Sequence, residues 1–340
     1  MTTAAGRRRP GTALLAAAAA TALALTGCSS SNASAGGKLS LVAYSVPKPA
    51  YEALQQAFAG TKQGKGTSWA SSYGPSGTQS AAVSNGQKAD YVAFSLEPDL
   101  TKLVPKFVDA NWNSGPTKGL VSKSVVVIAT RKGNPLHITG WADLVKPGVK
   151  IVTPDPGSSG SAKWNILAAY TSVLADGGTD DQAQAYLKQF FANVVSKPTS
   201  GANATSTFLN GTGDVLISYE NEAIAARQKG QPLDYLVPAE SILIENPAAV
   251  TKTAPQKAKD FLAFVESADG QKIFAGKGYR PVLDGVNAGT VAGANDPADP
   301  FPTVAKLQTI AGLGGWSAVN KKYFDKTTGI VTRIASGSGG

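Results

Sequence analysis

The sequence predicts an α/β fold divided into two lobes. Strand-like and helix-like segments alternate along the chain, which is typical of α/β proteins. The 340 residues, less an N-terminal leader, exceed what one hydrophobic core usually serves, so we expect two domains or lobes. A hydrophobic content of 42% with 16% charged residues indicates a soluble globular protein. No apolar run after residue 28 approaches the ~20 residues that a membrane helix needs.

The individual elements follow one another from residue 39 onward. The run Ser-Val-Val-Val-Ile-Ala-Thr-Arg at 124–131 indicates a buried strand. The other strands and helices are assigned from the spacing of their apolar residues. In chain order we expect strand 39–44, helix 50–58, strand 91–95, strand 124–131, strand 149–153, helix 162–175, helix 180–194, strand 214–219 and helix 256–266.

The junction at 149–165 is the most informative stretch. An apolar strand at 150–153 breaks at the Pro-Asp-Pro-Gly of 154–157, and a helix opens through Ser158, Ser159, Gly160 and Ser161. Small residues at a helix start leave the first backbone N–H groups uncovered, and the aligned peptide dipoles place roughly half a positive charge there. The junction therefore predicts a cradle for a small anion.

Two further loops have the same character. Residues 73–79 precede a short helix with Ser76 as its expected N-cap, and residues 199–203 precede a helix at 204–209. Neither these loops nor the 159–161 helix start contains arginine or lysine. Any one of them is explained as routine helix capping, but three in one α/β chain favour a shared site.

The donor set selects a class of ligand. Backbone N–H groups, serine hydroxyls and helix ends offer donors and few acceptors, which suits a fully deprotonated oxyanion. A protonated phosphate would bring an O–H without an acceptor, at a cost of ~1–3 kcal/mol. Sulfate therefore fits better than phosphate.

Catalytic signatures are missing. His137 is the one histidine of the sequence, and it lies in a turn without a nearby carboxylate or nucleophile pattern. We find no Walker loop, G-x-S-x-G elbow or His/Cys/Asp metal cluster, so we expect no enzyme, no cofactor and no metal. An extracellular enzyme on an anionic substrate stays the alternative from another class, although a catalytic serine normally needs a base beside it.

The N-terminus reads as an export signal. Arg7, Arg8 and Arg9 precede an Ala/Leu segment at 14–25, and Leu-Thr-Gly-Cys closes it at Cys28, which resembles a bacterial lipobox. We expect a signal peptide at 1–27, lipidation of Cys28, a flexible tether at 28–37 and attachment to the outer face of the cell membrane. An ordinary secretory signal with a stray cysteine is the alternative, and the Sec and twin-arginine routes both stay open.

The net charge of the chain does not point to a particular class of partner. The formal charge of +9 falls to +6 when the three leader arginines are subtracted, and the lysines are scattered singly. This disfavours nucleic-acid binding, which usually needs a basic patch interleaved with aromatics.

Several motifs along the chain occur in a distinctive order. They are Ser76-Gly77, residues 131–135, residues 141–149, residues 158–160 with Trp164 and Asn165, residues 213–217 leading into 220–223, residues 279–281 and residues 314–316. Together they resemble the periplasmic sulfate-binding proteins of sulfate/thiosulfate ABC importers, and the likeness covers most of residues 39–334.

The resemblance implies a set of ligand contacts. The family's contacts fall on Ser45, Ser76, Ser159, Gly160, Ser161, Ala202 and Tyr219. Ser159 would donate its hydroxyl and Tyr219 its phenol, and the others would donate backbone N–H groups.

Four positions depart from the family's classical pattern. Ser45 replaces an aspartate and Ser161 a glycine, both at positions that act through the backbone. Tyr219 replaces a tryptophan whose indole N–H donates, and Asn203 replaces an arginine beside the third helix start. Packing at the end of a strand is the alternative role for Tyr219.

The resemblance also implies the architecture and the partners. The fold is the two-lobed type II periplasmic binding protein fold, with lobe 1 at 38–122 and 238–295, lobe 2 at 123–237, a C-terminal helical segment at 296–334 that packs across the lobes, and a frayed tail at 335–340. The anion would bind between the lobes, and the closed monomer would dock on membrane permease subunits. Other tetrahedral oxyanions, such as molybdate or phosphate, and a surface adhesin or signalling role that keeps the fold stay open as alternatives.

Overall fold

A ten-stranded mixed sheet runs through the part of the chain that the structure describes. The computed structural model describes residues 37–335, so the predicted leader, Cys28, most of the tether and the tail beyond 335 lie outside the described residues. In spatial order the strands are β2 (Ser68–Gly74), β1 (Lys38–Tyr44), β3 (Tyr91–Ala93), β9 (Glu240–Val250), β4 (Leu120–Arg131), β7 (Val215–Tyr219), β5 (Ile151–Val152) and β6 (Val194–Ser196), with β10 (Lys306–Gln308) on β9 and β8 (Leu233–Leu236) on β4.

The first lobe is built on β1, which pairs parallel with β2 and β3. Its helices are α1 (Lys48–Ala59), α2 (Ser76–Ser84), α3 (Glu97–Thr101), α8 (Gln256–Glu266) and α9 (Ala268–Gly276). Tyr51 of α1 packs edge-on against Tyr91 of β3 and Phe274 of α9, with ring centroids 5.6 and 5.8 Å apart. Segments from both halves of the sequence therefore share this core.

The second lobe is built on β7, which pairs antiparallel with β4 and parallel with β5, and β5 pairs parallel with β6. Its helices are η1 (Trp141–Val145), α4 (Gly160–Ala175), α5 (Asp180–Ala192), α6 (Gly201–Leu209) and α7 (Glu220–Gln228). Trp164 and Tyr170 of α4 are 0% exposed, so α4 is a core helix rather than a surface helix.

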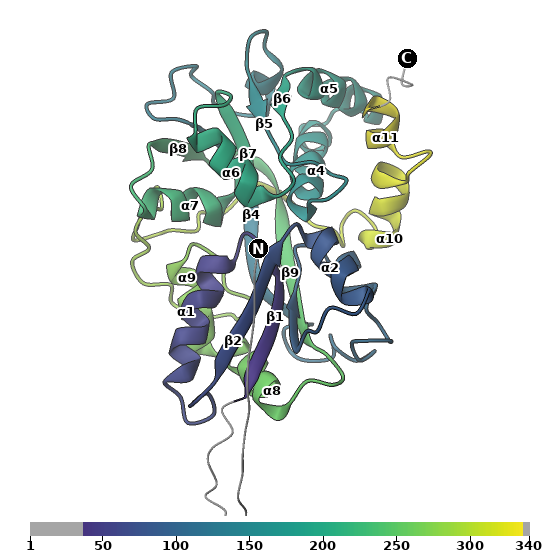
Figure 1. Cartoon of the computed structure of the whole chain (residues 1–340). Helices are drawn as coiled ribbons and strands as arrows, with labels where there is room; N and C mark the ends of the chain where they lie inside the picture. The colour runs from purple at the N-terminus through teal and green to yellow at the C-terminus, as the bar shows by residue number, and fades with distance from the viewer. Residues whose placement is uncertain (1–36, 336–340) are drawn as a thin grey trace, which may run out of the picture. The chain divides into compact units, whose positions relative to one another are not determined.

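Two long strands connect the lobes (Figure 1). Residues 120–125 of β4 pair with β9, and residues 126–131 pair with β7 and β8. Residues 248–250 of β9 pair with β3 of the first lobe. The expected lobe limits at 122/123 and 237/238 thus fall inside β4 and just before β9.

The C-terminal segment contains α10 (Gly315–Val319), η2 (Asn320–Phe324) and α11 (Ile330–Ala335). Trp316 packs edge-on against Trp164, and Tyr323 against Tyr170, each pair with ring centroids 5.0 Å apart. These contacts place the segment against α4 of the second lobe.

Local apolar patterns predicted many of the elements, but the long strand β9 was missed although its sequence is largely apolar and Ile242 and Ile244 are fully buried. The edge strand β2, with the sequence Ser-Trp-Ala-Ser-Ser-Tyr-Gly, lacks apolar alternation. Helix α7 directly continues the predicted strand at 214–219, and its first turn buries Glu220, Asn221 and Glu222, which sequence patterns assign to a surface.

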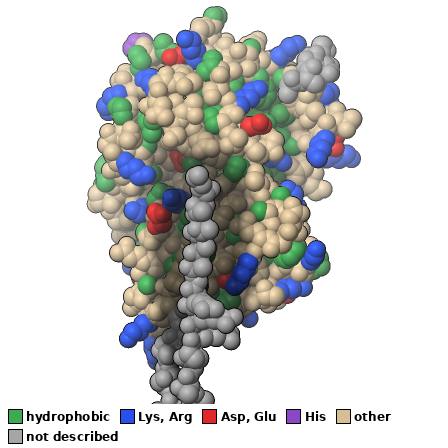
Figure 2. Space-filling view, viewed as in Figure 1, with side chains coloured by type: hydrophobic (Ala, Val, Ile, Leu, Met, Phe, Trp, Pro, Cys, Tyr) green, Lys and Arg blue, Asp and Glu red, His purple; other side chains and the backbone are tan. Residues whose placement is uncertain are grey.

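The surface is consistent with the scattered lysines of the sequence. Figure 2 shows Lys and Arg side chains dispersed over both lobes on the visible face, without one continuous basic patch there. None of the helices within residues 37–335 combines the length and apolar character needed to cross a membrane.

Candidate functional site

Loops that follow the strands of both lobes converge on one small cavity. Residues of the first lobe that line it are Tyr44, Ser45, Gly74, Pro75, Ser76 and Ser95, and those of the second lobe are Ser159, Gly160, Ser161, Ser200 and Gly201. The three helix starts that the sequence singled out therefore border the same space. The lining closes tightly and leaves no room for a water-sized sphere in this structure, so a bound ion would have to part the lining slightly.

The start of α4 supplies uncovered donors. Ser159 is its N-cap in an extended conformation and makes no side-chain capping hydrogen bond. Ser159 and Ser161 are each 3% exposed, and Gly160 between them is buried. The first-turn N–H groups of a 16-residue helix thus face the cavity without a capping side chain.

The prediction that Ser76 caps α2 is wrong. Pro75 is the N-cap, and Ser76 is the first helical residue. The Ser76 hydroxyl donates to Asp99 Oδ2 at 2.8 Å and accepts from the Ser95 N–H at 3.0 Å. The hydroxyl is thereby engaged as a donor to Asp99, and Ser76 offers the cavity its backbone N–H at the helix start, the group that the resemblance assigns.

The start of α6 is brought close by a glycine. Ser200 is the N-cap, and its hydroxyl accepts from the Asn203 N–H at 3.2 Å. A Cβ placed on Gly201 would lie 2.7 Å from Ser161 Oγ and 3.0 Å from Glu222 Oε2. A side chain at Gly201 would separate α6 from α4, so the absence of Cβ lets the two helix starts meet.

Ser45 and Ala202 lie beside a second, larger cavity. The Ser45 hydroxyl is buried and has no hydrogen-bond partner among the described residues, and Ser45 borders both cavities. Ala202, expected to donate to the anion, borders the larger cavity, while its neighbour Gly201 borders the smaller.

Tyr219 lies behind the small cavity rather than along its wall. Its side chain is 0% exposed, and its hydroxyl is 2.7 Å from Ser95 Oγ. Burial raises the pKa of the Tyr219 hydroxyl well above its ordinary value, and hydrogen bonds with Ser161 and Ser95 oppose the rise. The phenol expected to donate to the anion is therefore paired with a serine of the opposite lobe.

Ser95 is a site residue that the sequence analysis missed. Its carbonyl accepts from Trp164 Nε1 at 3.0 Å and from Asn246 Nδ2 at 3.1 Å, so both lobes hold it. Its position at the carboxyl end of the predicted strand at 91–95 was a usable signal, because ligands of open α/β sheets bind at and beyond the carboxyl ends of strands.

Glu222 is a second missed residue. It is 8% exposed, and its carboxylate accepts from Ser218 Oγ at 2.9 Å and Thr205 Oγ1 at 3.1 Å. Both donors are neutral, so burial dominates and raises the pKa of Glu222 to about 7.

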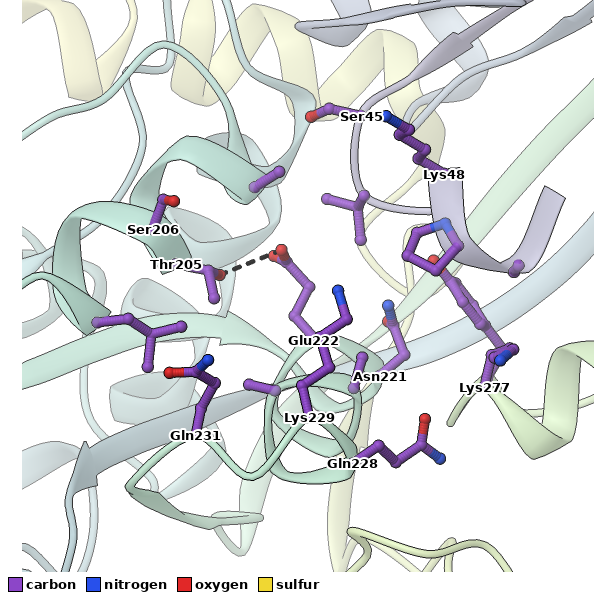
Figure 3. A pocket seen from close by; sticks show the side chains of 18 residues that line it. Ser45, Lys48, Thr205, Ser206, Asn221, Glu222, Gln228, Lys229, Gln231 and Lys277 are labelled. Carbon is purple, nitrogen blue, oxygen red and sulfur yellow. Dashed lines mark hydrogen bonds between the residues drawn. The ribbon is translucent and has the colours of Figure 1, made fainter. Parts of the chain in front are cut away.

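The larger cavity, of about 560 Å³, opens beside Glu222 (Figure 3). Its polar lining includes Lys48, Lys229 and Lys277, whereas none of the described residues that line the small cavity is a lysine, arginine or histidine. Figure 3 shows the Glu222 side chain pointing toward Thr205, with Ser45 and Lys48 on another wall.

Groups that would support other chemistry lie elsewhere. His137 is exposed in the turn that follows β4, as expected for a surface histidine. Within residues 37–335, no cluster of three or more His, Cys, Asp and Glu could hold a metal ion.

Comparison with known proteins gives consistent matches. The family described as "Bacterial extracellular solute-binding protein" matches residues 39–280. A sulfate-binding protein of Synechococcus elongatus is 37% identical over 90% of this chain and 91% of its own length. A thiosulfate-binding protein of Pseudomonas aeruginosa is 31% identical over 83% of this chain and 88% of its own. The structure of the sulfate-binding protein SubI from Mycobacterium tuberculosis matches with a TM-score of 0.79 and 42% identity, covering 85% of this chain and 99% of that chain.

Proposed function

Because this chain belongs to the bacterial extracellular solute-binding proteins, in the group of sulfate- and thiosulfate-binding proteins, we propose that it captures sulfate and delivers it to an ABC importer. Thiosulfate is the second candidate ligand. The observation that carries the proposal is the convergence of three helix starts on one small cavity, whose lining within residues 37–335 contains no cationic side chain.

The donors of this cavity suit a dianion without a proton. The starts of α2, α4 and α6 direct N–H groups at it, and the Ser159 hydroxyl adds a side-chain donor. Fixed dipoles of this kind stabilise charge without moving, and a water-poor site strengthens them. Ser45, Ser76, Ser159, Gly160, Ser161 and Ala202 are the proposed contacts, and Tyr219 is proposed to act through Ser95.

Closure of the lobes completes the donor set. Ser45, Ser76 and Ser95 come from the first lobe, while the α4 and α6 starts come from the second. Trp164 Nε1 and Tyr219 both bond Ser95 across the lobes. A ligand that contacts both lobes binds the closed form better and shifts the population toward it.

Delivery requires that the protein stay near its permease. We propose the Cys28 lipid as the anchor and residues 28–37 as the tether, with the closed monomer presenting both lobes to the membrane subunits. ATP hydrolysis then belongs to a separate subunit.

A titration series tests the assignment. Isothermal titration calorimetry with sulfate, thiosulfate, molybdate and phosphate across pH 5–8 should show the tightest binding for sulfate or thiosulfate. Phosphate should bind more weakly, most of all at low pH where it carries more protons. Binding of molybdate or phosphate without heat from sulfate or thiosulfate would refute the ligand assignment.

A further inference from the structure

Three lysines bring positive charge to the larger cavity, and the proposed anion contacts use none of them. Lys48 begins α1, Lys229 follows α7 and Lys277 follows α9, and all three line this cavity. Among the described residues, Lys48 has an ion pair with Glu52 at 3.9 Å, and Lys229 and Lys277 take part in none. Their charge is therefore largely uncompensated by protein carboxylates.

The larger cavity adjoins the small one. Ser45 borders both, and Ala202 of the larger cavity is bonded to Gly201 of the smaller. The buried, unpartnered Ser45 hydroxyl thus lies where the two spaces meet. On its other side the small cavity is covered by Ser95, which both Tyr219 and Trp164 bond.

Among the described residues that line the larger cavity, Glu222 is the one carboxylate. Its oxygens accept from the Ser218 and Thr205 hydroxyls, and it forms no ion pair with a described lysine. With its pKa raised to about 7, it is only partly charged at neutral pH. Three lysines against one such carboxyl leave the lining net positive.

We infer that the larger cavity is an access vestibule for inorganic oxyanions, in which Lys48, Lys229 and Lys277 attract the anion toward Ser45 and the start of α6. This inference rests on the proposed function. The helix-start N–H groups of the small cavity and the lysines of the larger cavity act over different distances. Helix-start N–H groups act within a turn, whereas full charges act over about a Debye length, ~10 Å at 0.1 M salt. Charges at an opening raise association rates by roughly 10- to 1,000-fold in steered systems.

Stopped-flow fluorescence on the full-length protein with sodium sulfate tests the vestibule. Trp164 lies at the lobe contact and serves as the reporter. The test variant combines Lys48→Gln, Lys229→Gln and Lys277→Gln. The control variant combines Lys62→Gln, Lys259→Gln and Lys326→Gln, three exposed lysines that line neither cavity. Both variants lose the same net charge, so only the location differs.

At low ionic strength we expect the test variant to lose at least fivefold in kon with koff unchanged, and the control variant to lose less than twofold. The difference should shrink as salt rises toward 0.5 M. A kon within the range of the control would overturn the inference. A change confined to koff would also overturn it, because the lysines would then contact the bound anion. Failure of the unmodified protein to bind sulfate would instead refute the proposed function.

Discussion

The two neighbouring cavities differ in their burial and in the charge of the side chains that line them. In the part of the chain that the structure describes, the small one is lined mainly by serines, glycines and helix starts, with no cationic side chain. The larger one is lined by three lysines on its more exposed side and by Glu222 deeper in. The proposed binding position is thus surrounded by the fixed dipoles of helix starts. The larger cavity beside it, the proposed route of entry, is lined by the charged ends of flexible lysine side chains.

The two cavities therefore have different proposed roles: the small one discriminates between anions, and the larger one attracts them. Fixed N–H donors discriminate by geometry and protonation state, because each must meet an acceptor. Lysines attract any anion and are screened by salt. A mutation should therefore change affinity and ligand choice at one cavity, and association rate at the other.

The two largest effects are expected at the start of α4, the first from a methyl group that would keep the lobes apart. A Cβ on Gly160 would lie 2.6 Å from Ser95 Cβ and Oγ. Gly160→Ala should weaken sulfate binding by about 10- to 100-fold, since overpacking costs ~1–3 kcal/mol. Calorimetry measures this, with Gly115→Ala, where the new Cβ meets nothing within 4 Å, as the control. Unchanged affinity would mean that the bound form does not bring Gly160 and Ser95 together.

Removal of one donor should come next. Ser159→Ala should lose ~1.5–3 kcal/mol of sulfate binding, the range for a hydrogen bond to a charged group. Ser158→Ala is the matched control, because the Ser158 hydroxyl donates to the Thr199 carbonyl and lines neither cavity. Equal affinities of the two variants would place the anion elsewhere.

Glu222 should set a pH dependence of stability. Its pKa is raised from 4.5 to about 7 in the folded protein, so folding favours the protonated form. The contribution of Glu222 to the free energy of unfolding should be fully present below pH ~4.5. It should fall by on the order of 1–3 kcal/mol as the pH rises from ~4.5 to ~7. Urea denaturation of Glu222→Gln should lack this fall. A variant that kept the same pH profile would assign the fall to other groups.

The smallest effect is expected at the lobe-to-lobe hydroxyl pair. Tyr219→Phe should weaken sulfate binding by ~0.5–1.5 kcal/mol, mainly through a faster koff, because it removes the neutral hydrogen bonding of the phenol to Ser95 and Ser161. Tyr186→Phe, whose hydroxyl donates to the Trp141 carbonyl, is the control. A loss beyond ~2 kcal/mol would instead indicate that Tyr219 donates directly to the anion, as the resemblance implies.

Features that depend on residues close together in the sequence could be predicted, and features that depend on contacts between distant residues could not. The junction at 150–161 could be interpreted because a strand, a Pro-Gly break and a small-residue helix start are all local signals. Ser76 was placed at the correct helix end, but its capping role was wrong, because Asp99 lies far along the chain and takes its hydroxyl. Glu222 was missed because a buried carboxyl within a helix has no local signature.

The sequence by itself determined the α/β alternation, the three donor-rich helix starts and the preference for a fully deprotonated anion, since these depend on neighbouring residues and their chemistry. Only the tertiary structure decided that the three starts share one cavity, that Ser95 joins them and that three lysines line the space beside it. The Ser95–Tyr219 contact spans 124 positions along the chain. Contacts of that range depend on how the sheet and helices pack, which no local pattern of residues specifies.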